Sequence, residues 1–137
     1  MESYDDGDLE WSDHFPDELS QRVKICAPYT SPIMNLSTVE NLQFLQNFHA
    51  FRNKLNVNEV FDLLPEDKRS ANKPLTSLSS GMLQRVKLLL SMLPEVPMVI
   101  LDEPLSNLDF QGVEWYENLV DIFLDKTTVL VGSNDEK

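Results

Sequence analysis

The sequence predicts an α/β protein in which a small parallel sheet is combined with a group of helices. Two apolar runs, 98–101 and 127–131, indicate strands, and an amphipathic pattern between them indicates a helix. Strand, helix and strand in that order form a right-handed βαβ unit with parallel strands. A further short apolar run at 23–27 adds a third candidate strand.

Length and composition restrict the class of protein. The chain has 137 residues, of which 42% are hydrophobic, so we expect one compact domain or one piece of a larger one. Its formal net charge of −12 repels a phosphate backbone, and we therefore expect no direct contact with nucleic acid. No apolar run approaches the roughly 20 residues of a membrane span, so we expect a soluble chain, although a membrane partner remains open. The single cysteine, Cys26, is interpreted as a small core residue, with a reactive thiol as the alternative.

The first half of the chain predicts short elements around one longer helix. Residues 1–21 show no sustained period and predict turns with a short edge strand, and the strand after them must stop at Pro28. A capping box from Ser37 to Glu40 predicts a helix that continues to about Arg52. Its apolar residues at helical spacing are interpreted as core (Val39, Leu42, Phe44, Leu45, Phe48 and Phe51).

The second half alternates helices and strands. A second cap pattern at 56–59 predicts a short helix that is stopped at Pro65, and a polar loop follows to Ser77. A helix is expected from Gly81 to about Leu93, closed by two prolines. The run 98–101 shows no alternation, so we expect a strand that is buried on both faces, and we expect the same of 127–131 after an amphipathic helix.

Two adjacent carboxylates, Asp102 and Glu103, follow the strand at 98–101. Together with Ser133, Asn134 and Asp135 they fall at the carboxyl edge of the sheet, where ligands of parallel sheets bind. An Asp in this position can hold Mg²⁺ through its water shell, and a neighbouring Glu can deprotonate an attacking water. The alternative is an Asp that caps the next turn beside an exposed Glu, and for this pair alone it is the more common arrangement.

Three segments together resemble the motifs of ATP-binding cassette (ABC) ATPases. The segment 78–82, Leu-Ser-Ser-Gly-Met, is similar to the family's signature motif, usually Leu-Ser-Gly-Gly-Gln; 99–104 resembles the Walker B strand and 106–109 the D-loop. The resemblance extends from about Val23 to the C-terminus and implies a partial P-loop NTPase core with parallel strands plus an α-helical subdomain. It implies one partial ABC domain over 1–137: the end of the N-terminal core and the Q-loop region at 1–35, the helical subdomain with the signature motif at 36–93, and the Walker B, D-loop and switch region at 94–137.

The signature turn has a physical basis for binding phosphate. The backbone N–H groups of Ser80, Gly81 and Met82 open a helix, where they are expected to be unpaired and where the helix dipole favours an anion, while Ser79 adds a hydroxyl. The resemblance implies that this turn meets the γ-phosphate of ATP bound by the opposite subunit of a head-to-tail dimer.

Further roles follow from the resemblance alone. It implies that Asp102 positions Mg²⁺, that Glu103 is the general base, and that Asp109 communicates across the dimer. It also implies that the helices at 39–64 dock on a membrane-spanning transporter subunit. The chain is therefore expected in the cytoplasm, peripheral at the inner face of the membrane.

Several positions depart from the family pattern. No Gly-x-x-x-x-Gly-Lys-Ser/Thr (Walker A) segment is present, and the four glycines are too dispersed to form one. The segment 27–29, Ala-Pro-Tyr, stands where the family has its Q-loop glutamine. In the signature segment, Ser80 and Met82 replace a Gly and a Gln. Asn134 stands at the position of the switch histidine, and an amide side chain cannot shuttle a proton. His14 and His49 lie far from these motifs and are not expected to be ligands.

The sequence therefore predicts an ATP-binding and ATP-hydrolysing subunit of an ABC transporter, with ATP and Mg²⁺ as cofactors, present as a fragment that is inactive alone. Two alternatives remain open. One is a non-catalytic ABC-like dimerisation or regulatory module. The other is a soluble ABC ATPase of DNA repair or translation.

Overall fold

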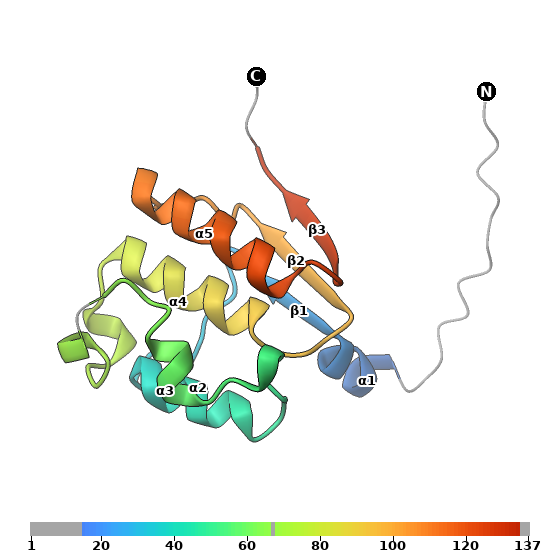
Figure 1. Ribbon diagram of the computed structural model, residues 1–137, viewed down its shortest axis with the longest axis horizontal. Coiled ribbons are helices and arrows are strands. Elements are labelled where there is room, and N and C mark those ends of the chain that lie inside the picture. The colour runs from blue at the N-terminus through green and yellow to red at the C-terminus, as the bar shows by residue number, and fades with distance from the viewer. Residues whose placement is uncertain (1–14, 67, 135–137) are drawn as a thin grey trace.

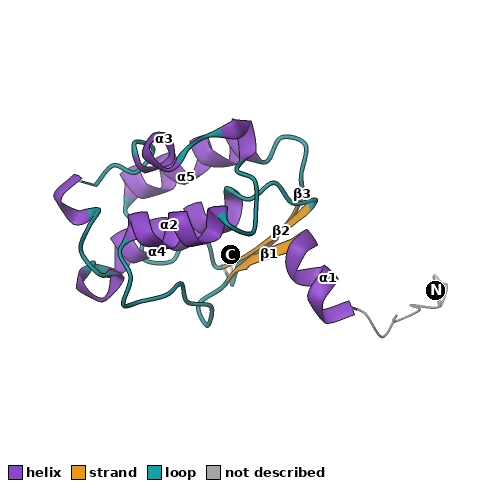
Figure 2. Ribbon diagram, turned by 90° about the horizontal axis from the view of Figure 1, so that it is seen from below, coloured by secondary structure: helices purple, strands orange, loops and turns teal. Residues whose placement is uncertain are grey.

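The computed structural model describes residues 15–66 and 68–134. Figure 1 shows a three-stranded sheet beside a group of helices, and Figure 2 shows α1 apart from the other helices, near one end of the sheet. Short 3₁₀ turns lie in the loops between the main elements. The helices and strands are α1 (Phe15–Arg22), β1 (Val23–Cys26), α2 (Thr38–Gln46), α3 (Val57–Phe61), α4 (Ser80–Met92), β2 (Met98–Asp102), α5 (Phe110–Phe123) and β3 (Thr128–Gly132).

The three strands form one parallel sheet in the order β1-β2-β3. Ile100 of the central strand pairs with Ile25 on one side and with Leu130 on the other. The connection from β2 through α5 to β3 is the predicted βαβ unit. The predicted α/β class and the parallel direction of the strands are thus confirmed.

Helices α4 and α5 pack on one face of this sheet and form the core with it. Val99, Leu101 and Leu89 are completely buried, and Cys26 is buried among the same residues. Its burial raises the pKa of the Cys26 thiol, while Lys87 and Ser91 partly oppose this effect. Cys26 is therefore a core residue, as predicted.

The prediction that the strands are buried on both faces is wrong. Along β2 the burial alternates, with Val99 and Leu101 buried and Met98 and Ile100 only half-buried. Leu130 is 52% exposed and Ile25 44% exposed. Successive side chains of a strand point to opposite faces of the sheet. A continuous apolar run therefore permits burial of both faces, but it does not show that other segments cover both of them.

Helix α2 begins as predicted but is shorter. Ser37 Oγ accepts a hydrogen bond from the Glu40 amide at 3.2 Å, and the Glu40 carboxylate accepts one from the Ser37 amide at 2.7 Å, which completes the capping box. These hydrogen bonds hold the pKa of Glu40 below its ordinary value. The helix ends at Gln46 rather than near Arg52, because the chain turns there and brings Phe51 beside Pro94.

The shorter helix changes which of its apolar residues belong to the core. Leu42 and Phe51 are buried, and Val39 and Leu45 are partly buried against the core. The predicted core positions Phe44 and Phe48 are wrong: both are exposed, and their rings contact each other at a tilt, with centroids 5.1 Å apart.

Two other boundaries differ from the sequence prediction. The segment from Phe15 to Arg22 is a helix, not a turn or an edge strand, and Pro16 stands in its first turn, where a missing amide costs nothing. The first fourteen residues of the predicted turn region lie outside the described residues. Helix α3 has the predicted capping box at Asn56 and ends at Phe61, before the predicted stop at Pro65.

Arg52 joins the helices to the sheet, which the sequence did not predict. Its Nε donates to the carbonyl oxygen of Met92 at 2.8 Å, its Nη2 to that of Val96 at 2.9 Å, and its Nη1 to Thr127 Oγ1 at 2.7 Å. A single guanidinium thus binds the end of α4, the loop before β2 and the residue before β3. Its planar set of donors suits this geometry.

We predict that Arg52→Met lowers the free energy of unfolding by roughly 3 kcal/mol, because the methionine keeps the apolar stem but leaves two carbonyl groups without their donor. Urea unfolding followed by circular dichroism measures the change. The neighbouring Lys54→Met is the control, since the Lys54 side chain is exposed. Equal unfolding midpoints for the two variants would contradict the prediction.

Candidate functional site

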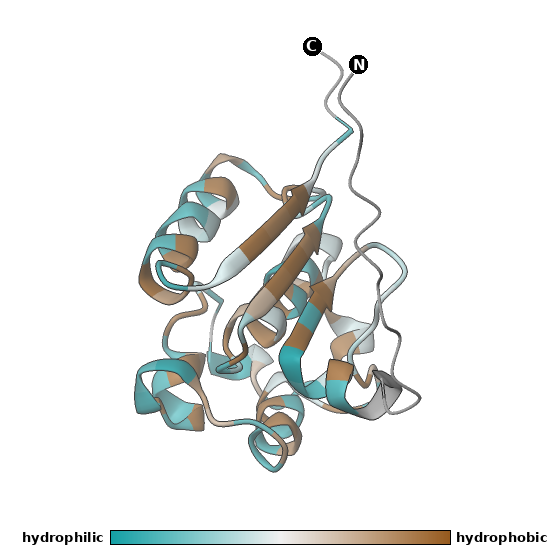
Figure 3. Ribbon diagram, turned by 90° about the vertical axis from the view of Figure 1, so that its right-hand side faces the viewer, coloured by the Kyte–Doolittle hydropathy of each residue, from teal (hydrophilic) through white to brown (hydrophobic). Residues whose placement is uncertain are grey.

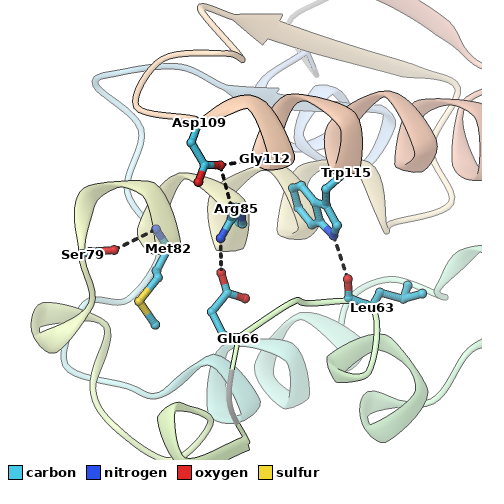
Figure 4. Close-up of polar contacts among 8 residues, drawn as sticks. All are labelled: Leu63, Glu66, Ser79, Met82, Arg85, Asp109, Gly112 and Trp115. Atoms are coloured by element: carbon cyan, nitrogen blue, oxygen red, sulfur yellow. Dashed lines mark hydrogen bonds and ion pairs between the residues drawn. The ribbon is translucent and has the colours of Figure 1, made fainter.

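The signature turn forms the N-terminus of α4. Ser79 is the N-cap, and its Oγ accepts a hydrogen bond from the Met82 amide at 3.2 Å (Figure 4). The Met82 amide is therefore not unpaired, contrary to the sequence prediction. The amides of Ser80 and Gly81 stand in the first turn, where the helix itself provides no acceptor, and the side chains of Ser79 and Ser80 are exposed.

Gly81 allows this turn to lie directly on the predicted D-loop. A Cβ atom at position 81 would stand 3.0 Å from the carbonyl oxygen of Asn107. Asn107 itself has a left-handed backbone, with φ of 63°. Nearby, Gln84 joins α4 to the residues just before the D-loop, because its buried side chain donates to the carbonyl of Pro104 at 3.0 Å. The signature turn and the D-loop are therefore one surface in this chain.

Asp102 is the last residue of β2 and pairs with Gly132 of β3. A Cβ at position 132 would lie only 2.9 Å from Asp102 Oδ1, so the glycine makes the space that the carboxylate occupies. Among the described residues, no group of three or more His, Cys, Asp or Glu side chains gathers at one point. Asp102 can supply one carboxylate to Mg²⁺, an ion that keeps several of its waters in protein sites.

Glu103 and Asn134 meet at the end of the central strand. Glu103 Oε1 accepts a hydrogen bond of 2.7 Å from the Asn134 backbone N–H, and the Glu103 amide donates to the Gly132 carbonyl at 2.8 Å. Glu103 has a left-handed backbone, with φ of 51°. The structure thus brings the predicted base and the predicted switch residue together, through the main chain of Asn134 rather than through its amide side chain.

A hollow of about 210 Å³ separates Glu103 from the signature helix. Its wall includes Ser80 and Lys87 of α4 and Asn107 of the D-loop. Lys87 Nζ donates to the carbonyl of Ala27 at 2.7 Å, which ties the segment at the Q-loop position to α4. The carboxylate, the helix N-terminus and the D-loop therefore face a common space, which is open to a ligand or to a second protein.

Asp109 caps α5 and links it to α4. Its Oδ1 accepts hydrogen bonds from the Gly112 amide at 2.8 Å and from Arg85 Nη2 at 3.1 Å (Figure 4). Arg85 Nη1 also reaches Glu66 Oε1 at 3.1 Å, and the Glu66 side chain is only 7% exposed. A second link joins Trp115 Nε1 to the Leu63 carbonyl at 2.7 Å. The partners Glu66 and Leu63 were missed because nothing local in the sequence pairs them with α4 and α5.

His49 lies in the loop after α2 and is not part of the wall of the hollow between Glu103 and the signature helix; burial together with the charge of Lys24 lowers its pKa. His14 lies outside the described residues. The prediction that neither is a ligand stays a prediction.

A parallel sheet with an acid pair at its carboxyl edge, beside a serine-capped glycine turn, gives this chain the fold of part of an ATP-binding cassette. The model of the ABC transporter family matches residues 2–106. The chain belongs to this family.

Individual relatives agree with this assignment. The chain is 30% identical to the uncharacterized ABC transporter ATP-binding protein YcbN of Bacillus subtilis, over 73% of this chain and 33% of that protein. It is 27% identical to the cytochrome c biogenesis ATP-binding export protein CcmA of Vibrio vulnificus, over 93% of this chain and 64% of that protein. Among solved structures, the ATP-binding cassette MJ0796, in a dimer bound to ADP and Pi, superimposes with a TM-score of 0.71 at 23% identity, over 92% of this chain and 58% of that one.

The chain spans between one third and two thirds of the length of these three proteins. Within the described residues, no helix combines the length and the apolar character that crossing a bilayer requires.

We predict that Gly81→Ala displaces the D-loop. Alanine favours a helix, but its methyl group meets the Asn107 carbonyl oxygen at 3.0 Å, so the loop must move. Amide chemical shifts of 107–109 report this movement in an NMR spectrum. Ser80→Ala is the matched control, because it adds the same helix former one residue earlier and leaves Gly81 in place. Unchanged shifts at 107–109 in the Gly81 variant would refute the prediction.

We also predict that Arg85→Met destabilises the fold by about 3–5 kcal/mol, because it leaves the Glu66 carboxylate buried without its cation. Combining it with Glu66→Gln removes the unpaired charge and restores part of the loss. Thermal and urea unfolding of the single and double variants measure both effects. Additive losses in the double variant would show that the two side chains do not interact.

Proposed function

We propose that this chain is part of the ATP-binding subunit of an ABC transporter and that it offers its signature turn to ATP held by a second cassette in a head-to-tail dimer. The observation that best supports this proposal is the first turn of α4. Its Ser80 and Gly81 amides lie at an exposed, positively polarised helix end that rests on the D-loop. A phosphate presented from outside the chain can approach this end directly.

The strand-end residues take the remaining roles in the proposal. Glu103 accepts a proton from the attacking water. The backbone N–H of Asn134 holds one oxygen of the Glu103 carboxylate in place. Asp102 would hold a Mg²⁺ ion, which would neutralise charge on the ATP phosphates. Asp109 fixes the start of α5 and so the D-loop, which faces the second subunit.

The chain alone should not hold ATP tightly. It has no Gly-x-x-x-x-Gly-Lys-Ser/Thr segment to surround the triphosphate, and its signature turn provides only one end of an ATP site. Hydrolysis in this proposal therefore requires a second cassette.

The helical subdomain presents a surface that suits the membrane-spanning partner in the proposal. Beside α2 lies a hollow of about 240 Å³ whose wall includes Lys24, Ile33 and Phe44. The Phe44 ring contacts the tilted ring of Phe48 next to it, and both residues are exposed. Exposed aromatic and aliphatic groups around a hollow are typical of a protein interface. Docking here would hold the chain at the cytoplasmic face of a membrane.

The substituted positions support a second candidate, a non-catalytic dimerisation or regulatory module. The side chain of Met82 cannot donate a hydrogen bond to a phosphate, and the side chain of Asn134 cannot act as a proton shuttle. A soluble ABC ATPase of DNA repair or translation is the third candidate, although the net charge of −12 opposes nucleic-acid binding.

We predict that the purified 137-residue chain shows no magnesium-dependent ATPase activity, and that a complete cassette co-assembled with it does. Glu103→Gln in this chain should then lower the co-assembled activity by about 100-fold, since general-base catalysis contributes roughly that factor or more. Phosphate release measures the activity, and Glu114→Gln, a substitution on α5, is the control.

Activity that is indifferent to Glu103→Gln would favour the regulatory module. ATP hydrolysis by the chain alone would contradict both the proposed transporter subunit, which needs a second cassette, and the non-catalytic regulatory module. Pull-down of a membrane subunit, rather than of nucleic acid, separates the transporter from the soluble ATPase.

A further inference from the structure

Glu103 also lines a second hollow, which lies between β3 and the segment that leads into the D-loop. Its volume is about 290 Å³, and its wall includes Leu105, Ser106, Tyr116 and Val131. Figure 3 shows β3 as an outer strand of the sheet with apolar residues along most of its length, and the hollow lies at the carboxyl end of this strand. We call this space the β3 hollow.

Tyr116 brings to the β3 hollow a hydroxyl group that the chain itself does not use. The residue belongs to α5 and is only 9% exposed, yet within the described residues its hydroxyl makes no hydrogen bond. Burial raises the pKa of Tyr116, with further contributions from Cys26 and Glu117, so the hydroxyl keeps its proton at neutral pH. Tyrosine hydroxyls that are buried usually have a partner. This hydroxyl is therefore placed to bind a group from outside the chain.

The Glu103 carboxylate is fixed at one oxygen and open at the other. Its Oε1 accepts the Asn134 backbone N–H at 2.7 Å, whereas no donor from the described part of the chain reaches Oε2. Glu103 is half-buried and is the only charged residue in the described wall of the β3 hollow. The hollow beside α4 differs, because Lys87 lines it. The β3 hollow therefore suits a cation better than the hollow beside α4 does.

The polar groups of the wall select a ligand that only donates hydrogen bonds. A carboxylate accepts and does not donate, and the hydroxyl oxygens of Ser106 and Tyr116 can accept as well. Amidinium and guanidinium groups are planar, positively charged and carry donors alone. Beside them, Leu105 and Val131 are 43% and 57% exposed and provide an apolar wall for the body of a ligand. An anion, by contrast, would face the charge of Glu103.

We propose that the β3 hollow binds a small organic cation that joins an amidinium or guanidinium group to a flat apolar body. The charged group donates to Glu103 Oε2 and to the Tyr116 hydroxyl, and the body lies against Leu105 and Val131. Such a ligand occupies the carboxylate that the proposed function assigns to the attacking water. Its binding requires neither ATP nor a second cassette.

The test uses the full 137-residue chain and benzamidine, an amidinium group on a phenyl ring, as the probe. A titration followed by NMR should show saturable shifts of the Leu105 and Val131 amides. Benzamide has the same shape without the charge, and it should bind about tenfold more weakly because it loses a hydrogen bond between charged groups. Methylguanidine keeps the charge without the apolar body, and it should also bind about tenfold more weakly.

Two variants separate the polar contacts. Tyr116→Phe should weaken benzamidine binding roughly fivefold, because it removes one hydrogen bond. It should leave the urea unfolding midpoint unchanged, since the hydroxyl has no hydrogen-bond partner in the described chain. Glu103→Gln should weaken binding about tenfold by removing the charge. Tyr29→Phe is the matched control, because it removes the same group from a residue that is 80% exposed and lies outside the wall of the β3 hollow.

The proposal would be overturned by absence of saturable benzamidine binding, by equal affinities for benzamidine and benzamide, or by equal affinities of the Tyr116→Phe and Tyr29→Phe variants. Shifts confined to Ser80 and Lys87 would also overturn it, because they would place the probe in the hollow beside α4. Binding is measured here without nucleotide. Its failure would therefore leave the proposed function standing, and an inactive co-assembled cassette would leave this site in place.

Discussion

The burial of α4 is the interaction on which the rest of the structure depends. Leu88, Leu89 and Met92 are completely buried, and the helix packs against β1, β2, α2 and α5. Because the helix is held along its length, the turn at its start has a fixed position relative to the sheet. Ser79 and Gly81 then adapt this end to the D-loop, so the geometry of the site follows from the packing of a helix that is otherwise ordinary core.

Local signals in the sequence predicted local structure well. The capping boxes at Ser37 and Asn56 are formed as predicted, because a cap requires only residues that lie within one turn of each other. The parallel sheet was also predicted from the order of its apolar runs. The exposed rings of Phe44 and Phe48 and the uncovered side of Leu130 were not, since an apolar residue in a sequence does not show whether another segment covers it.

The candidate site was predictable as a set of residues but not as an arrangement. The motifs identified Ser79, Asp102 and Glu103, yet only the structure shows that Glu103 faces the signature helix while the Asp102 carboxylate lies beside Gly132 of β3. The bridge from Arg85 to Glu66 joins residues nineteen positions apart in the chain and has no local pattern. Such contacts depend on tertiary packing, which periodicity does not encode.

The hydrogen bond between Glu103 and the backbone of residue 134 determines which substitutions are compatible with this contact. The carboxylate is held by a backbone N–H, so every residue except proline can supply the same hydrogen bond. A histidine and an asparagine at position 134 are therefore interchangeable for holding Glu103. Position 132 is different, because a side chain there would meet Asp102 Oδ1 and displace that carboxylate. A substitution at position 134 should thus leave the Glu103 contact in place, whereas one at position 132 should move the side chain of Asp102.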